Sequence, residues 1–191
     1  MDYYKVNEIE KQNFNEVIFM RITILGFMGT GKSSVGNLLA EKIVYPFYDL
    51  DELIVEEKGM SINEIFNMYG EDYFREVEKK ALKKIVLEKD DFVLASGGGV
   101  VISPINRNFI KKYTLPILLE ASVDVICNRL KDDNSRPLLK VENPQREIEK
   151  LLLQRNSYYH QFNHRINTNN KDISVIVAEI LAIIRKKNKW G

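Results

Sequence analysis

The sequence contains little cysteine and no excess of charge of either sign. Cys127 is the single cysteine of the 191 residues, so no intramolecular disulfide can form, and a reducing compartment is expected. The 28 basic and 27 acidic side chains give a formal net charge of +1. This balance provides no global field to attract nucleic acid or an anionic membrane, so we expect neither as a partner.

Long hydrophobic runs are also missing. No apolar stretch approaches the roughly 20 residues that a membrane-spanning helix needs. The N-terminus, Met1-Asp2-Tyr3-Tyr4-Lys5, lacks the basic-then-apolar order of a signal peptide. These absences predict a cytoplasmic protein. Internal repeats and low-complexity tracts are not found either, and a chain of this length with 45% hydrophobic residues suits one α/β domain.

One segment stands out among the residues that are present. Residues 26–33 read Gly-Phe-Met-Gly-Thr-Gly-Lys-Ser, between the apolar run 22–25 and the helical pattern 35–43. Glycines let consecutive N–H groups point at phosphates, and the following helix directs the positive end of its dipole there. Lys32 can reach the β- and γ-phosphates, and Ser33 can ligate Mg²⁺. The segment therefore predicts a nucleotide phosphate-binding loop.

Apolar runs and helix breakers predict strands and helices that alternate along the chain. The expected strands are 21–25, 46–50, 92–96, 115–119 and 165–168, and the expected helices are 32–43, 52–58, 61–89, 105–112, 122–130, 144–160 and 173–187. This alternation is typical of a parallel sheet covered on both faces. Ser61 and Glu64 form a capping box, and Pro144 suits a first helical position. Residues 131–143 have no periodic pattern and are expected to form a mobile loop.

Residues 1–19 precede the first strand and are interpreted as an N-terminal extension. Met20 follows them, so translation starting there would yield a chain without the extension. The domain itself is expected to span residues 20–191.

Two carboxylates follow the second expected strand. Asp49 and Asp51 lie two residues apart at the carboxyl end of that strand, where parallel α/β sheets bind ligands. One carboxylate can help to hold hydrated Mg²⁺ while the other orients or deprotonates an acceptor hydroxyl. An equally weighted alternative is that one caps the next helix and the other is solvated.

An arginine and a glutamate share a helical face further on. Arg75 and Glu78 lie three residues apart, and an arginine held by a carboxylate makes a rigid fork for an acid substrate. An ordinary surface ion pair is the commoner explanation of this spacing. The third strand ends in Gly97-Gly98-Gly99, which allows backbone N–H groups to approach a small ligand.

Further cations follow the predicted third strand. Arg136 precedes Pro137 in the loop 131–143, where a side chain can swing over the γ-phosphate. Arg155 and Tyr159 lie one helical turn apart and form a second candidate anion clamp, and Arg129 can stack on a base or contact a phosphate.

These segments together resemble the shikimate kinase family, from about residue 21 to the C-terminus. Two features depart from that family: Ser157-Tyr158 stands where relatives usually have Pro-Leu, and the N-terminal extension is additional. The matching segments are 26–33 with Gly36, Phe47-Tyr48-Asp49-Leu50-Asp51, Ile65-Phe66, Gly70-Glu71, Phe74-Arg75-Glu76-Val77-Glu78, Gly97-Gly98-Gly99, Arg136-Pro137-Leu138-Leu139, and Arg155 with Tyr159.

The resemblance implies a three-layer α/β/α fold of the P-loop kinase type, with five parallel strands in the order 2-3-1-4-5, a substrate-binding region at 52–89 and a lid at 131–143. It implies ATP and Mg²⁺ as cofactors, shikimate as the acceptor, and a monomer. The implied catalytic residues are Lys32, Asp51 and Arg136, and the implied metal-site residues are Ser33 and Asp49. The implied nucleotide-binding residues are Gly29, Thr30, Gly31, Lys32, Ser33, Ser34, Arg129 and Arg136. The implied acceptor-binding residues are Asp51, Arg75, Gly97, Gly98, Gly99 and Arg155.

The expected reaction is ATP-dependent phosphorylation of the 3-hydroxyl of shikimate, within aromatic amino-acid biosynthesis. One alternative is a related small-molecule kinase that acts on gluconate or a nucleoside monophosphate. Another is a nucleotide-dependent switch or binding module without an acceptor, which would need no second anion site.

Overall fold

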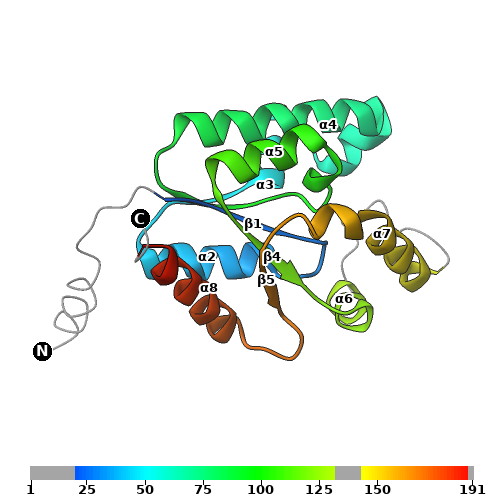
Figure 1. The fold of residues 1–191 in the computed structure, drawn as a ribbon. Coiled ribbons are helices and arrows are strands. Elements are labelled where there is room, and N and C mark those ends of the chain that lie inside the picture. The colour runs from blue at the N-terminus through cyan, green and yellow to red at the C-terminus, as the bar shows by residue number, and fades with distance from the viewer. Residues whose placement is uncertain (1–19, 132–142, 189–191) are drawn as a thin grey trace, which may run out of the picture.

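A five-stranded parallel sheet lies at the centre of the computed structural model, which describes residues 20–131 and 143–188 (Figure 1). Each of its neighbouring strand pairs is parallel, and the spatial order is β2-β3-β1-β4-β5. The expected fold class and strand order are therefore confirmed. The strands are β1 (Arg21–Gly26), β2 (Phe47–Asp49), β3 (Phe92–Ala95), β4 (Leu115–Glu120) and β5 (His164–Asn167).

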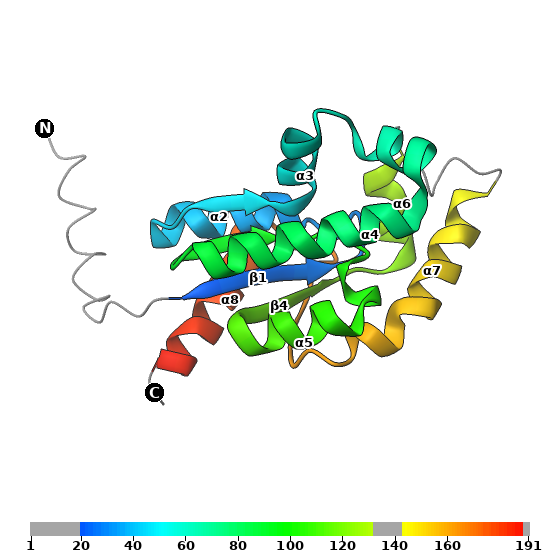
Figure 2. The ribbon, with the colours of Figure 1, turned by 90° about the horizontal axis from the view of Figure 1, so that it is seen from above.

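Helices cover both faces of this sheet. The helices α2 and α8 lie on one face, and α3, α4 and α5 lie on the other (Figure 1). Near the carboxyl end of β1, α6 and α7 extend beyond the sheet (Figure 2). The helices are α2 (Lys32–Ile43), α3 (Leu50–Lys58), α4 (Ile62–Glu88), α5 (Pro104–Tyr113), α6 (Val123–Leu130), α7 (Pro144–Tyr159) and α8 (Ile173–Asn188).

The core is divided by the sheet because side chains alternate along each strand. Ile22 and Ile24 of β1 pack in one cluster with Leu39 of α2 and Ile180 of α8. Leu25, the next residue along β1, belongs to a second cluster that also contains residues of α4, α5, α6 and α7. Both faces of the strand are thus buried, which is why the strand is a continuous apolar run in the sequence.

Local capping signals define several helix ends. The Ser61 side chain accepts a hydrogen bond from the Glu64 N–H, and the Glu64 side chain accepts one from the Ser61 N–H, so the capping box is present. Asn143 caps α7, with Pro144 at its first position. Two details were not predicted: Gly70 kinks α4 with a φ of 80°, and a 3₁₀ turn, η1 (Val100–Ile102), precedes α5. Neither leaves a periodic hydrophobic pattern in the sequence.

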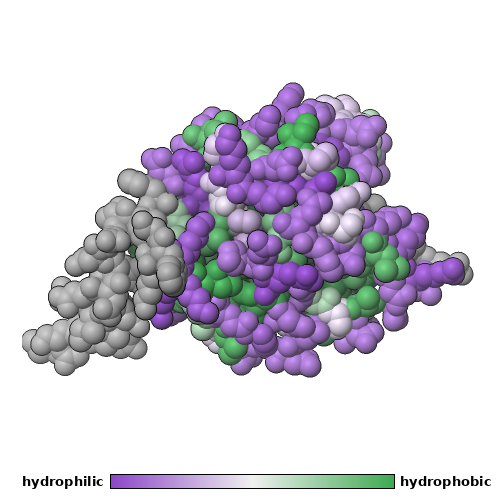
Figure 3. Space-filling view, in the orientation of Figure 1, coloured by the Kyte–Doolittle hydropathy of each residue, from purple (hydrophilic) through white to green (hydrophobic). Residues whose placement is uncertain are grey.

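Parts of the expected organisation lie outside the described residues. These parts are the N-terminal extension 1–19 and residues 132–142, which include Arg136 and most of the expected lid. Within the ranges that the structure describes, no helix has the length and apolar character to cross a membrane. On the face seen in Figure 3, hydrophilic side chains predominate and apolar side chains lie between them in separate patches.

Candidate active site

The loop between β1 and α2 has a backbone that only glycine adopts easily. Gly26, Gly29 and Gly31 have φ angles of 148°, 75° and 93°. A Cβ at Gly26 would also lie 2.5 Å from the carbonyl oxygen of Leu119, because the loop packs closely against β4. Gly31 is the N-cap of the 12-residue helix α2, so the positive end of the helix dipole is directed at the loop.

The side chains of this loop fold back onto its own backbone. The Thr30 hydroxyl donates a hydrogen bond of 2.7 Å to the Phe27 carbonyl, and the Lys32 ammonium donates one of 3.0 Å to the same oxygen. Lys32 therefore lies against the turn that precedes it. The backbone N–H groups of the helix start and the Lys32 charge are gathered in one place, as a phosphate site requires.

A hollow of about 370 Å³ adjoins the loop. Arg129 of α6 reaches across it and donates to the Gly29 carbonyl (3.1 Å) and the Thr168 carbonyl (3.0 Å). The sequence did not point to Lys171 or Ile173, because no spacing connects these residues to the loop. The hollow is lined by Gly29, Thr30, Gly31, Lys32, Ser33, Ser34, Val35, Arg129, Leu130, Lys171, Ile173 and Ile176.

Ser33 and Asp49 meet at the edge of the loop. The Ser33 hydroxyl donates a 2.5 Å hydrogen bond to Asp49 Oδ2, and Asp49 Oδ1 accepts one of 3.0 Å from the backbone N–H of Asp51. Asp49 therefore caps α3 and also faces the phosphate-binding loop, so the two explanations of this residue are compatible. In the described part of the chain, no group of three or more His, Cys, Asp or Glu residues is placed to hold a metal ion. The Ser33 and Asp49 oxygens are instead a small hard-ligand pair.

Arg75 and Glu78 form a buried ion pair rather than a surface one. Their nitrogen and oxygen lie 3.0 Å apart, and the side chains are 19% and 1% exposed. Glu71 accepts two further hydrogen bonds from the Arg75 guanidinium, at 3.1 and 2.8 Å. Burial lowers the pKa of Arg75, but Glu78 and Glu71 more than offset this and the net shift of the pKa is upward. The guanidinium is thus fixed by two carboxylates.

Glu78 has one oxygen without a hydrogen-bond partner among the described residues. Its Oε2 pairs with Arg75, whereas its Oε1 is buried and unpaired. Burial raises the pKa of Glu78 to about 7, against the lowering effect of Arg75, and the nearby Asp51 charge raises it further. A Cβ at Gly97 would lie 2.8 Å from Glu78 Oε1 and 2.8 Å from Asp51 Oδ1. The two carboxyl groups therefore flank Gly97.

The other two glycines of this loop contact the arginines. A Cβ at Gly99 would lie 2.5 Å from both terminal nitrogens of Arg75, so only a glycine lets the guanidinium pack against this backbone. The Gly98 carbonyl accepts hydrogen bonds from Arg155 Nη1 (3.3 Å) and the Tyr159 hydroxyl (2.9 Å), both on α7. The loop thus joins α4 to α7.

Arg155 also connects this crevice to the phosphate-binding loop. Its Cζ lies 5.5 Å from the centre of the Phe27 ring, a cation–π arrangement. Burial raises the pKa of Tyr159 to about 12, so its hydroxyl remains a neutral donor to Gly98. Phe27, like Glu71, was not singled out by sequence reasoning, because a Phe inside a glycine-rich loop gives no sign of the arginine above it.

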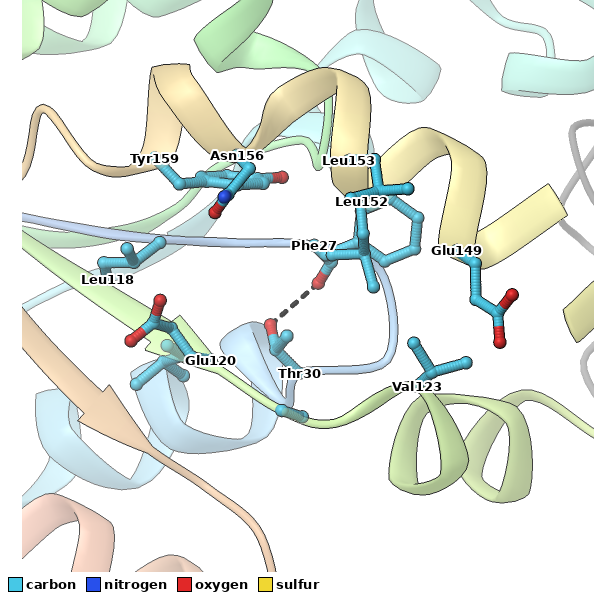
Figure 4. A pocket seen from close by; sticks show the side chains of 12 residues that line it. Phe27, Thr30, Leu118, Glu120, Val123, Glu149, Leu152, Leu153, Asn156 and Tyr159 are labelled. Carbon is cyan, nitrogen blue, oxygen red and sulfur yellow. Dashed lines mark hydrogen bonds between the residues drawn. The ribbon is translucent and has the colours of Figure 1, made fainter. Parts of the chain in front are cut away.

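A larger cavity of about 450 Å³ lies beside this site, between β4, α6 and α7 (Figure 4). Its wall includes Phe27, Leu118, Val123 and Leu152, and its described lining residues contain the carboxylates Glu120 and Glu149 but no lysine or arginine. The described lining therefore supplies no cation for an acid or a phosphate. The expected anion-binding groups are therefore the arginines beside the glycine loop and not the residues of this cavity.

The structure brings most of the expected site residues together in two neighbouring groups at the carboxyl end of the sheet. Only Arg136 lies outside the described residues. The first group adjoins α2 and comprises Gly29, Thr30, Gly31, Lys32, Ser33, Ser34, Asp49 and Arg129. The second group lies against the glycine loop and comprises Asp51, Arg75, Gly97, Gly98, Gly99 and Arg155.

The fold, with its phosphate-binding loop and the arginines gathered around the glycine loop, is that of a class, the P-loop kinases that act on small molecules. The family model described as shikimate kinase matches residues 28–185. A shikimate kinase of Geobacter sulfurreducens is 45% identical over 165 residues, which cover 86% of this chain and 91% of that protein. One of a Sulfurihydrogenibium species is 43% identical, covering 87% and 98%. The chain belongs to the shikimate kinase family.

Solved structures agree with this assignment. A shikimate kinase from Acinetobacter baumannii, in complex with shikimate, superposes with a TM-score of 0.86 at 32% identity and covers 93% of this chain and 98% of its own. A gluconokinase from Sinorhizobium meliloti gives a TM-score of 0.56 at 18% identity. The second likeness shows only that the fold is shared.

Proposed function

We propose that this protein transfers the γ-phosphoryl group of ATP to the 3-hydroxyl of shikimate and releases shikimate 3-phosphate and ADP, as a step of aromatic amino-acid biosynthesis. The observation that carries this proposal is the placement of Arg75 and Arg155 on either side of Gly98 and Gly99, in the same crevice as the phosphate-binding loop. An acceptor gripped by two arginines and a nearby carboxylate is a small polyhydroxylated acid.

The donor half would hold the ATP phosphates with backbone N–H groups and Lys32. Catalysis of phosphoryl transfer is mainly positioning and charge neutralisation, because little covalent chemistry is left to the protein. Lys32 lies within reach of its own loop's carbonyl, so it can exchange that hydrogen bond for one to a phosphate oxygen. Arg136, in the expected lid, remains a prediction as a second cation on the phosphates.

Ser33 and Asp49 would hold Mg²⁺. Their oxygens are hydrogen-bonded at 2.5 Å beside the start of α2, and they suit an ion that takes few protein ligands and keeps several waters. When bound, the ion neutralises developing charge on the β- and γ-phosphate oxygens. The chain's own contribution is to fix both oxygens, through the α2 start and through the cap of α3.

The acceptor half would grip the substrate carboxylate with Arg75 and Arg155 and the ring hydroxyls with Asp51. Glu78 and Glu71 hold the Arg75 guanidinium, and both of its terminal nitrogens lie against the backbone of Gly99. Asp51 lies beside Gly97, where it can accept a hydrogen bond from the attacking hydroxyl or take its proton.

A single chain contributes both halves of this site, which supports a functional monomer. Sedimentation at assay concentrations tests this point, and activity that requires a larger species would contradict it.

One assay tests the proposed reaction. ADP release is measured with Mg·ATP alone and with shikimate, quinate, gluconate and nucleoside monophosphates in turn. Shikimate is expected to accelerate release most strongly. Acceleration by another acceptor in place of shikimate would transfer the assignment to a related kinase, and no acceleration by any of them would indicate a nucleotide-binding module.

A further inference from the structure

The end of α7 is joined to the glycine loop at a second point, away from the arginines of the acceptor site. Arg107 of α5 donates from Nη1 to the carbonyls of Val101 (2.6 Å) and Ile102 (2.9 Å) in η1. Its Nε donates to Gln161 Oε1 at 3.1 Å, just after α7. One guanidinium therefore connects α5, the turn that follows Gly99, and the end of α7.

An aromatic ring completes this contact. The Arg107 Cζ lies 4.6 Å from the centre of the Tyr158 ring, and Gln161 donates back to the Ser157 carbonyl at 3.4 Å. Arg107 is 8% exposed, and no carboxylate of the described residues forms an ion pair with it. A cation removed from water in this way depends on carbonyl oxygens and on the face of the ring for compensation.

We propose that Arg107 and Tyr158 are a positioning pair that sets the place of Arg155 relative to Gly98, and through it the affinity for the carboxylate of the acceptor. This inference rests on the proposed function. Neither residue needs to touch the substrate.

The geometry supports this role because the two contacts lie on successive residues. Tyr158 faces Arg107, whereas its neighbour Tyr159 donates to the Gly98 carbonyl. On the other side of the contact, Val101 and Ile102 lie in the turn η1, two and three residues after Gly99, which packs against Arg75. A change in the contact between Arg107 and Tyr158 is therefore expected to shift both α7 and the turn that follows Gly99.

Of the two hydrogen bonds that α7 makes to the Gly98 carbonyl, the one from Arg155 is longer than the one from Tyr159, which is 2.9 Å. Arg155 donates to Gly98 at 3.3 Å, which is long for a hydrogen bond, and the proposed function requires its guanidinium to turn toward a substrate carboxylate. The Arg107 bond of 2.6 Å to Val101 is shorter and lies outside the crevice, so it persists when substrate binds.

The test compares Tyr158→Leu and Tyr158→Phe in the full chain, with shikimate and Mg·ATP varied separately. Tyr158→Leu removes the ring face and is expected to raise the KM for shikimate by about three- to tenfold, with the KM for ATP and kcat close to wild type. Tyr158→Phe retains the ring and should keep a wild-type KM. Arg107→Lys should raise the same KM, and its effect should not add to that of Tyr158→Leu.

Tyr113→Leu is the matched control. Tyr113 forms an aromatic pair with Phe109, with ring centres 4.8 Å apart. Both residues lie on α5, so this pair joins α5 to neither α7 nor the glycine loop. The substitution should change thermal stability without changing the KM for shikimate. One outcome is that shikimate accelerates ADP release by the wild-type protein while Tyr158→Leu leaves the KM for shikimate unchanged. In that case the positioning role would be wrong and the proposed function would stand.

Two other outcomes would also overturn the inference. Tyr158→Leu could raise the KM for shikimate and the KM for ATP equally, with Tyr113→Leu doing the same. That result would show that Arg107 and Tyr158 contribute only to folding. If shikimate did not accelerate ADP release by the wild-type protein, the proposed function itself would be wrong. Should Arg107→Lys fail to fold, the Leu and Phe variants at Tyr158 still decide, with shikimate affinity measured by calorimetry as a second readout.

Discussion

The two halves of the site are built in different ways. The centre of the proposed donor half is a run of consecutive residues, Gly26 to Ser33, which depends on backbone conformation and on the start of α2. The acceptor half draws on α3, α4, the glycine loop and α7, and it depends on side chains. A contiguous motif is visible in any sequence that contains it, whereas a dispersed constellation exists only once its segments are packed together.

The halves also differ in electrostatics. The phosphate-binding loop presents neutral N–H groups and a lysine, but the acceptor half buries Arg75 and Arg155 with a carboxyl whose pKa is shifted to about 7. Buried charges are stable only while their partners are in place. Substitutions in the donor half should therefore affect the chemical step, and those in the acceptor half should affect acceptor affinity.

The largest effect is expected from Lys32→Ala. Loss of a positioned cation at the phosphates should lower kcat by about a hundred- to a thousandfold, with less change in the KM for shikimate. Steady-state kinetics measures both values. Lys42→Ala, which changes an exposed lysine in the last turn of the same helix, is the control. If the Lys32→Ala enzyme kept the wild-type kcat, Lys32 would not stabilise the transition state.

Arg75→Ala should have the next largest effect. Removing one of two carboxylate-binding arginines is expected to raise the KM for shikimate by about a hundredfold and the KM for ATP much less. Lys79→Ala is the control, because it breaks a surface ion pair with Glu76 on the same helix. An effect confined to ATP would contradict the role assigned to Arg75.

Gly99→Ala sharpens the comparison without removing a charge. The backbone at Gly99 has φ −102° and accepts alanine, but the new Cβ would lie 2.5 Å from the Arg75 nitrogens and displace the guanidinium. We expect the KM for shikimate to rise by about tenfold, with little further effect when Arg75→Ala is also present. Gly59→Ala is the control for a loss of stability alone: its Cβ would meet no atom within 4 Å, but the left-handed φ of 65° at this helix cap strains alanine, so stability should fall while the KM for shikimate stays unchanged. Full additivity of the two substitutions would show that Gly99 acts independently of Arg75.

The last effect concerns stability rather than kinetics, and it is the pH dependence that Glu78 contributes. Its pKa is raised from 4.5 to about 7, so the folded state holds this proton more tightly than the unfolded chain does. The stability that the proton provides is complete below pH 4.5 and is lost as the pH rises through about 7. Urea unfolding between these values should show a fall of up to about 1.4 kcal/mol per pH unit that Glu78→Gln removes.

The control for that measurement is Glu76→Gln. Glu76 is an exposed carboxylate of the same helix whose pKa is lowered by its hydrogen bond with Lys79. It should leave the fall in stability in place. If wild type and Glu78→Gln showed the same pH profile, the protonation assigned to Glu78 would be wrong.

Much of the fold could be predicted because its signals are local. The alternation of apolar runs, the Ser61–Glu64 box and Pro144 placed the elements, and the resemblance supplied the strand order, which the structure confirms. The kink at Gly70 and the turn η1 were missed, because a single glycine and a three-residue turn leave no period to detect.

The residues of the candidate site likewise differ in whether the sequence alone could predict their roles. Spacing was enough to select Lys32 and Ser33, but it could not tell whether Arg75 and Glu78 were a surface pair or a buried one. Burial decided that question, since the Glu78 side chain is 1% exposed. Phe27 under Arg155, and Arg107 against Tyr158, were beyond sequence reasoning because each contact joins segments that are far apart in the chain.

The sequence by itself determined the phosphate-binding loop and the alternating elements, since both depend on the conformational preferences of neighbouring residues. Only the tertiary structure decided which carboxylate fixes which arginine, that Gly97 and Gly99 are required by close approach, and that Tyr159 of α7 meets Gly98 while Arg107 of α5 meets the following turn. The physical reason is that the charges and contacts of the acceptor half come from distant segments, and their energies are defined only after packing has removed water from between them.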